Sequence, residues 1–149
     1  MVMLYTELEH KIVKGEINIE TDCVWISDYR LGTDPTSKPI RHVKPTKVKI
    51  VNNDKLPKNK KVYYSNYHFR TLNKNGTISS KIIAPYDNTG FRSYTGVSLN
   101  IFMTEEECRE HYLSQCESVK NALEEYKDIY MKTFDVLINE ADELINEYK

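Results

Sequence analysis

The chain has 149 residues, the usual size of a single domain, and is long enough to bury a hydrophobic core. No run of about 18 apolar residues occurs, so the sequence predicts no membrane-spanning helix. The formal net charge of −1 conceals a division, because residues 1–104 hold 16 Lys and Arg against 9 Asp and Glu, whereas residues 105–149 hold 5 against 13. We expect one domain over residues 1–149, with a basic front part and an acidic rear part. The two parts could attract each other between subunits, or the basic part could present a positive surface to an anionic partner.

The cysteines and the N-terminus predict a cytoplasmic protein. Cys23, Cys108 and Cys116 are odd in number and lack the spacing of a disulfide framework, which favours a reducing compartment. The first residues lack the basic start and the apolar centre of a signal peptide.

Residues 1–104 are predicted to form an antiparallel sheet, preceded by a short helix within residues 5–19. Apolar, alternating or aromatic runs indicate the strands, and Asn75-Gly76 is a turn signal between two of them. The expected strands lie within residues 23–26, 48–51, 61–69, 78–83 and 98–103. Because these strands precede a segregated helix, the sequence predicts an α+β architecture rather than βαβ units.

Residues 86–96 are the strongest candidate for a ligand-binding loop. The segment holds three aromatic residues, an arginine and two glycines, and it is longer and more aromatic than an ordinary connector between strands. Aromatic rings can stack on a base, Arg92 can pair with a phosphate, and Asn88 can hydrogen-bond to an amide-like edge. Gly90 and Gly96 permit positive φ, so that backbone N–H groups can converge on an anion. The alternative is a hairpin with a decorated loop whose tyrosines lie over the sheet.

Residues 105–149 are predicted to form one long α-helix. Thr104 and Glu107 have the spacing of a capping box, and three glutamates in the first turn suit the positive end of the helix dipole. Apolar residues then recur at steps of three or four, and no Pro or Gly interrupts them. They are Cys108, Tyr112, Cys116, Val119, Leu123, Tyr126, Tyr130, Phe134, Leu137, Ala141, Leu144 and Tyr148.

A continuous helix of this length would measure about 65 Å, which one domain of about 100 residues cannot cover. We therefore expect a kink at Lys132-Thr133, because the β-branched threonine weakens helix propensity there. We also expect a homodimer or a larger even-numbered oligomer, because an exposed apolar row is unusual on a soluble monomer.

Signatures of catalysis are mostly absent from the sequence. The four histidines lack the paired spacing of a catalytic zinc site, and Cys108, His111 and Cys116 form no recognised zinc pattern. No phosphate-cradling glycine loop or nucleophile elbow occurs. His68 beside Arg70 could serve acid–base chemistry, but no second base lies near it in sequence. We expect that the protein is not an enzyme and binds no metal or cofactor. The dispersed lysines and the acidic helix argue against binding of long nucleic acid.

The predicted sheet, the Asn-Thr-Gly-Phe-Arg-Ser run at residues 88–93 and the Thr-Glu-Glu-Glu cap at residues 104–107 resemble the first-described family of phage Thoeris anti-defence proteins. The resemblance covers most of the chain and rests on the order of the predicted elements and on one loop. It implies a kinked C-terminal helix, a dimer, and a protein that holds a cyclic ADP-ribose isomer without cleaving it. The implied role is sequestration of a signal made by a TIR-type defence enzyme inside an infected bacterium.

A cyclic ADP-ribose carries two phosphates and an adenine, so its site needs fixed cations and stacking rings. We expect Phe91 or Tyr94 to stack on the adenine and Arg92 to bind the diphosphate. The complete set of candidate ligand-binding residues is Arg70, Asn88, Phe91, Arg92, Tyr94, Thr95, Asn100 and Arg109.

The remaining candidates have supporting roles. Arg70 and Arg109 would assist in binding the diphosphate, and Asn88 or Asn100 would bind base or ribose edges. Structural alternatives remain open: Phe91 can be a core residue, Asn100 can be a solvent-facing strand residue, and Arg109 can pair with Glu105 or Glu106 on the helix surface.

Two other functions fit the same sequence. A small phage inhibitor could use the basic sheet and its tyrosines to bind a host defence protein directly. A phosphodiesterase or glycohydrolase acting on the same cyclic signal would differ from a sequestering protein by turnover.

Overall fold

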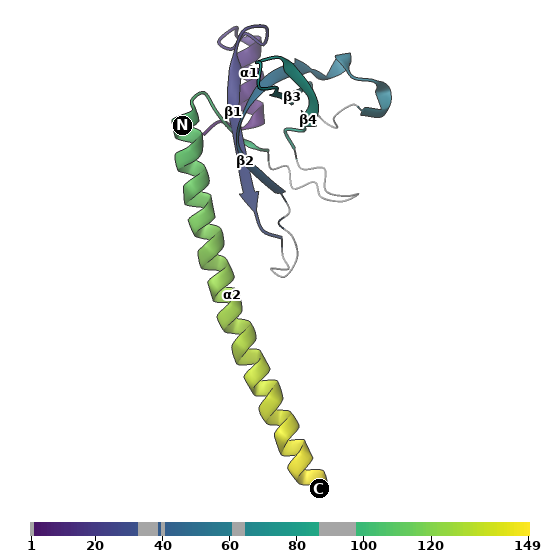
Figure 1. Ribbon diagram of the computed structural model, residues 1–149, viewed down its shortest axis with the longest axis vertical. Coiled ribbons are helices and arrows are strands. Elements are labelled where there is room, and N and C mark those ends of the chain that lie inside the picture. Colours follow the sequence, from purple (N-terminus) through teal and green to yellow (C-terminus); the bar gives the residue numbers. More distant parts are fainter. Residues whose placement is uncertain (1, 33–38, 40, 61–64, 87–97) are drawn as a thin grey trace.

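The computed structural model describes residues 2–32, 39, 41–60, 65–86 and 98–149. Within these residues, five antiparallel strands form one sheet in the order β4-β3-β2-β1-β5, with a short helix before it and a long helix after it (Figure 1). The strands are β1 (Cys23–Arg30), β2 (Arg41–Asn52), β3 (Tyr67–Leu72), β4 (Ile78–Ile83) and β5 (Asn100–Phe102). The helices are α1 (Tyr5–Val13) and α2 (Glu105–Tyr148), and two 3-10 helices, η1 (Asn53–Lys55) and η2 (Lys58–Lys60), follow β2. The α+β architecture predicted from the sequence is confirmed.

Four of the five strands differ in length from the prediction. β1 continues to Arg30 rather than ending at residue 26, and β5 covers only Asn100–Phe102 of the predicted 98–103. β2 begins at Arg41 rather than at residue 48 and runs through Pro45. The β1–β2 register shifts beside this proline, between Val43 and Thr46. Proline has no N–H to donate to the ladder, so it is tolerated in a strand at such an irregularity. The predicted strand 61–69 is described only in its last part, as β3, because residues 61–64 lie outside the described ranges.

The main hydrophobic core lies between α1 and one face of the sheet. Tyr5 and Leu8 of α1 are buried together with Val24 and Ile26 of β1 and Phe69 of β3. Side chains of a strand alternate between its two faces, so these residues define the α1 face of the whole sheet.

The first turns of α2 lie against the opposite face. Ile101 belongs to the core on the α1 face, so its neighbour Phe102 points to the other side, where its ring lies 5.4 Å from that of His111. The Tyr29 ring likewise lies 6.3 Å from that of Tyr112 on α2. The sheet is therefore a middle layer between the two helices.

Helix α2 is continuous over 44 residues, about 66 Å at 1.5 Å per residue. The predicted cap is present, since Thr104 accepts a hydrogen bond from the N–H of Glu107 at 3.3 Å. The predicted kink at Lys132-Thr133 is wrong, because the helix runs through this position without interruption and Figure 1 shows no sharp bend. The Thr133 hydroxyl donates to the Ile129 carbonyl at 3.0 Å, so its side chain is accommodated within the helix.

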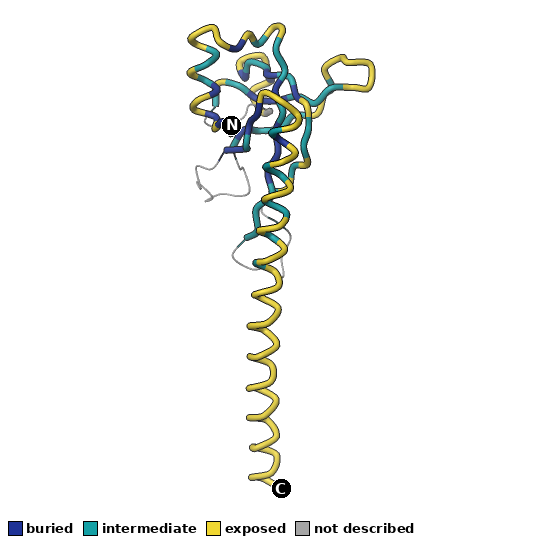
Figure 2. Tube along the Cα trace, turned by 90° about the vertical axis from the view of Figure 1, so that its left-hand side faces the viewer, coloured by how far each residue is buried: buried dark blue, intermediate teal, exposed yellow. Residues whose placement is uncertain are grey.

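Most of α2 extends away from the sheet (Figure 2). From Leu123 onward every residue of the helix is exposed, including Phe134 at 58 % and Leu137 at 54 %. Within the described ranges, no helix is both long and apolar enough to cross a membrane.

His68 is a buried polar residue of β3. Its side chain is inaccessible to solvent, and its Nε2 atom accepts a hydrogen bond from Arg70 Nε at 3.3 Å. Burial, reinforced by the positive charge of Arg70, lowers the pKa of His68 from its ordinary 6.5 to about 4.

This histidine should make the fold sensitive to acid. Below pH 6.5 the unfolded chain takes up a proton at His68, whereas the folded chain does not until about pH 4. The free energy of unfolding should therefore fall between pH 6.5 and 4, by at most about 3 kcal/mol, since one pKa unit corresponds to about 1.4 kcal/mol. Urea unfolding at a series of pH values should show a shallower slope for His68→Gln than for the wild type.

The matched control is His10→Gln, which removes an imidazole that is exposed on α1. Its slope should equal that of the wild type. A His68→Gln variant with an unchanged slope would contradict the assignment of this acid sensitivity to His68.

Candidate anion-binding site

The pairing of β1 with β2 places two arginines opposite each other. Arg30 pairs with Arg41 at the end of the two strands, and Asp28 pairs with Val43. Asp28 and Arg30 alternate with Tyr29 and so share the face of the core residue Ile26, which is the α1 face. The two guanidinium groups therefore belong to the same side of the sheet.

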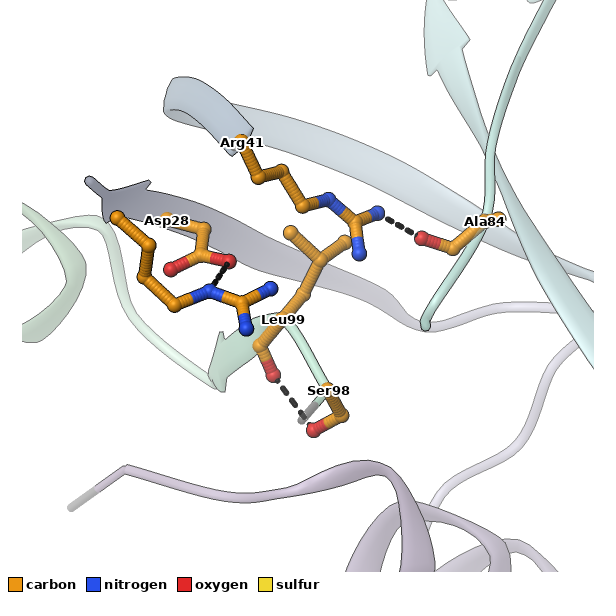
Figure 3. Close-up of polar contacts among 6 residues, drawn as sticks. Asp28, Arg41, Ala84, Ser98 and Leu99 are labelled. Carbon is orange, nitrogen blue, oxygen red and sulfur yellow. Dashed lines mark hydrogen bonds and ion pairs between the residues drawn. The ribbon is translucent and has the colours of Figure 1, made fainter. Parts of the chain in front are cut away.

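A buried carboxylate lies beside these arginines. Arg30 Nε donates to Asp28 Oδ2 at 2.9 Å, and Asp28 is only 1 % exposed (Figure 3). Burial raises the pKa of Asp28 above its ordinary 3.8, although Arg30 and Arg41 act in the opposite direction. The loss of hydration thus outweighs the attraction of the two cations.

Arg41 contacts the chain shortly before the segment that the sequence indicates as a ligand loop. Its guanidinium donates a hydrogen bond to the carbonyl of Ala84 (Figure 3). Directly after this residue, the Pro85 carbonyl accepts from the N–H of Leu99 at 2.8 Å. Arg41 therefore lies where the chain leaves the sheet, beside the point to which it returns.

The two ends of this segment are held together and to α1. Tyr86 and Ser98 form an antiparallel bridge, and the Tyr86 ring contacts Tyr5 edge-on with centroids 5.2 Å apart. The Ser98 hydroxyl accepts from the N–H of Tyr5 at 3.1 Å and donates to the carbonyl of Leu99 at 2.9 Å (Figure 3). The frame around Arg41 is thus fixed by contacts from three parts of the chain.

The arrangement has the chemistry of an anion site. Arg30 Nη2 is buried and has no hydrogen-bond partner among the described residues, so any partner of this donor lies outside them. With all three groups ionised, Arg30, Arg41 and Asp28 together carry a net charge of +1. Guanidinium groups match phosphate and carboxylate oxygens in two-bond geometry. We call these three residues, with Ala84 and Ser98, the arginine cluster.

Five of the residues predicted from the sequence lie outside the described ranges. They are Asn88, Phe91, Arg92, Tyr94 and Thr95. Tyr86 and Ser98, which flank residues 87–97, are described; Ser98 belongs to the arginine cluster and forms the antiparallel bridge with Tyr86.

Arg70 lies apart from the arginine cluster. It follows the core residue Phe69 on β3, so its side chain points to the face opposite α1. Its described contact is the hydrogen bond that it donates to His68. Arg70 therefore shares neither the sheet face nor the strands of Arg30 and Arg41.

Asn100 and Arg109 also lie on the α2 side. Asn100 on β5 pairs with Ser27 and precedes the core residue Ile101, so it faces away from α1. Asn100 and Arg70 are separated by three strand spacings, or about 14 Å. Arg109 is 68 % exposed and forms an ion pair with Glu105 at 3.0 Å. Pairing with a glutamate of the same helix was the alternative to ligand binding that the sequence offered for Arg109.

Sequence reasoning missed Arg30 and Arg41. A usable signal was present, because the two arginines lie just outside the loop that begins at Gly32 and ends at Pro39. A hairpin through this loop brings its flanking residues opposite each other. By residue type alone, the two arginines do not stand out from the other positive charges of residues 1–104.

Comparisons of the chain with protein-family models, with curated proteins and with solved structures found no match.

The arginine cluster predicts that the protein binds inorganic pyrophosphate. Arg30→Gln and Arg41→Gln should each weaken this binding about ten- to a hundredfold, because loss of a charge-assisted hydrogen bond costs about 1.5–3 kcal/mol. Isothermal titration calorimetry at constant ionic strength would measure the affinities, and thermal unfolding would show whether each variant keeps its fold.

Arg109→Gln is the matched control, because it removes the same charge from the exposed surface of α2. Its affinity for pyrophosphate should stay within about twofold of the wild type. Equal losses in all three variants would show that net charge, rather than the arginine cluster, governs the binding.

Proposed function

We propose that the protein is a phage or mobile-element immune-evasion protein that binds and sequesters, without cleaving, a cyclic ADP-ribose isomer made by a bacterial TIR defence enzyme. The observation that carries this proposal is the position of Arg30 and Arg41 on the face of the sheet where residues 87–97 depart and return. A diphosphate placed there would meet fixed cations, and Ala84, which Arg41 contacts, precedes a segment whose sequence contains Phe91 and Tyr94.

Sequestration requires affinity alone. A protein in excess over the signal lowers the free signal in proportion to the ratio of Kd to protein concentration. The site must then hold the diphosphate in a rigid frame, because preorganised groups lose less freedom on binding. The contacts of Tyr5, Tyr86 and Ser98 around the arginine cluster supply such a frame. The proposed site of action is the cytoplasm of the infected cell.

The proposal can be tested by identifying what the protein retains. Excess protein is incubated with the nucleotide mixture made by a TIR enzyme, filtered and heat-denatured, and the released species are identified by mass spectrometry. We expect an intact cyclic ADP-ribose isomer from the wild type and at least tenfold less from Arg30→Gln, with Arg109→Gln as control.

Each other result excludes the proposal in a distinct way. A chemically altered nucleotide would indicate an enzyme. Absence of any retained nucleotide would favour the second candidate, a small inhibitor that binds a host defence protein directly.

That second candidate is supported by the apolar surface of α2. Leu123, Tyr126, Tyr130 and Phe134 are exposed on one side of the helix, which suits a protein partner. Such an inhibitor would co-purify with its target and would show no thermal shift with nucleotides.

We also propose that the protein is a homodimer or a larger even-numbered oligomer joined through α2. The exposed apolar row of this helix extends over about 26 residues, or 39 Å, from Leu123 to Tyr148. Burying it against another copy would remove it from water.

Light scattering at micromolar concentration should therefore give a mass of at least twice 17.5 kDa. Leu137→Asp should shift the protein toward monomer, because a charge buried at such an interface costs several kcal/mol. Asn139→Asp adds the same charge on the other side of the helix, and this control should keep the mass of the wild type. A wild-type mass of 17.5 kDa would rule out the assembly.

A further inference from the structure

The apolar positions of α2 have a symmetric spacing. We call them the α2 stripe, which comprises Val119, Leu123, Tyr126, Tyr130, Phe134, Leu137, Ala141, Leu144 and Tyr148. Residues 119–130 follow steps of four, three and four, and residues 137–148 follow the same steps. The two sets are equidistant from a midpoint between Thr133 and Phe134. In a reversed copy of the helix, every apolar position of these two sets therefore faces an apolar position, and Phe134 faces Thr133.

Side-chain size favours the reversed orientation over the parallel one. In an antiparallel pair centred on this midpoint, Tyr126 of one protomer faces Ala141 of its partner, and Tyr130 faces Leu137. In a parallel pair in register, each of these tyrosines would face its own copy. Alternation of large and small side chains fills an interface, whereas two facing rings leave space beside them.

Charge favours the same orientation. Residues 134–148 hold five acidic and no basic side chains, whereas residues 119–133 hold three of each sign. A parallel pair would set the two acidic halves against each other, whereas an antiparallel pair sets each against a neutral half. It also brings each acidic half toward the basic sheet of the partner, because residues 1–104 hold 16 basic against 9 acidic side chains.

A groove lies where the reversed helix would end. It has a volume of about 290 Å³ and lies between Tyr29 of β1 and the helix, and its other lining residues are Cys116, Val119, Lys120, Leu123, Glu124 and Lys127. In the antiparallel register, Tyr148 of one protomer lies opposite Val119 of its partner, and Leu144 lies opposite Leu123. The apolar end of the partner's helix thus meets the apolar wall of the groove, and its acidic residues approach the two lysines.

We propose that α2 pairs with α2 of a second copy in antiparallel orientation about the midpoint between Thr133 and Phe134, with the C-terminal end of each helix seated in the groove beside Tyr29 of the other. This inference goes beyond the proposed function, because it defines the occupant of the groove and the orientation of the helices. It does not depend on the ligand.

Directed disulfide cross-linking tests the register. Cys23→Ser and Cys116→Ser provide the background, while Cys108 stays because it is fully buried. One chain carries Tyr126→Cys and a second, differently tagged chain carries Ala141→Cys. After co-expression and mild oxidation, we expect a covalent dimer from the two chains together and at least tenfold less from either chain alone. In the antiparallel register, two copies of position 141 lie about 22 Å apart along the axis, which is beyond the reach of a disulfide.

A matched control pair lies on the other side of the helix. Asp128→Cys and Asn139→Cys are equidistant from the same midpoint, and both positions are exposed and about 140–160° from Leu123 around the helix. This pair should give no covalent dimer. Circular dichroism of every variant should match that of the background chain.

Three outcomes would overturn the proposal. Covalent dimers within each single-cysteine chain would show a parallel pair. Equal cross-linking of the control pair would show random collision. A monomeric mass without any cross-link would show that no second copy covers the stripe. Retention of a nucleotide is measured separately, so loss of this pairing and loss of the sequestration proposal are distinguishable.

Discussion

The antiparallel pairing of β1 with β2 is the contact on which the other described elements depend. These strands lie at the centre of the sheet, with β3 and β4 on one side and β5 on the other. Their alternation assigns Val24, Ile26 and Asp28 to the face covered by α1, and Tyr29 to the face contacted by α2. A shift of one residue in either strand would exchange the faces of all its side chains. The hydrophobic core, the attachment of α2 and the arginine pair are thus consequences of one register.

The same register creates an electrostatic cost at the end of the two strands. Asp28 is buried, and its pKa is raised, so the folded state holds the proton of this carboxyl more tightly than the unfolded state does. The free energy of unfolding therefore falls as the pH increases from 3.8 through the raised pKa, where the folded state loses this proton. A phosphate that accepts hydrogen bonds from Arg30 would compete with this carboxylate. It would also place a second negative charge nearby and so raise the pKa of Asp28 further. Binding of an anion and uptake of a proton by Asp28 would therefore favour each other.

Local signals account for what could be predicted from the sequence. The Thr104 cap, the steps of three and four in α2 and the Asn75-Gly76 turn each act within a few residues, and the structure contains all three. The kink failed because a threonine at an uninterrupted helical position can bond back to the preceding turn. The position of the arginine cluster follows from the pairing of strands, which residue types alone do not specify. Arg70 and Asn100 have suitable chemistry, but alternation along β3 and β5 turns both away from the face that carries Arg30 and Arg41.

The C-terminal half of α2 lacks contacts that would stabilise it in a single chain. The N-terminus has a side-chain cap and three glutamates that complement the positive end of the dipole. At the other end Glu143 and Glu147 lie near the negative end of the dipole, and the last turn contains no basic residue. Helical stability in proteins comes mostly from packing of an apolar face, which this half of α2 lacks in a single chain. An antiparallel partner would supply both missing contributions, because its groove offers apolar contacts together with Lys120 and Lys127. Formation of the last turns of α2 and formation of the helix pair would then be a single cooperative step.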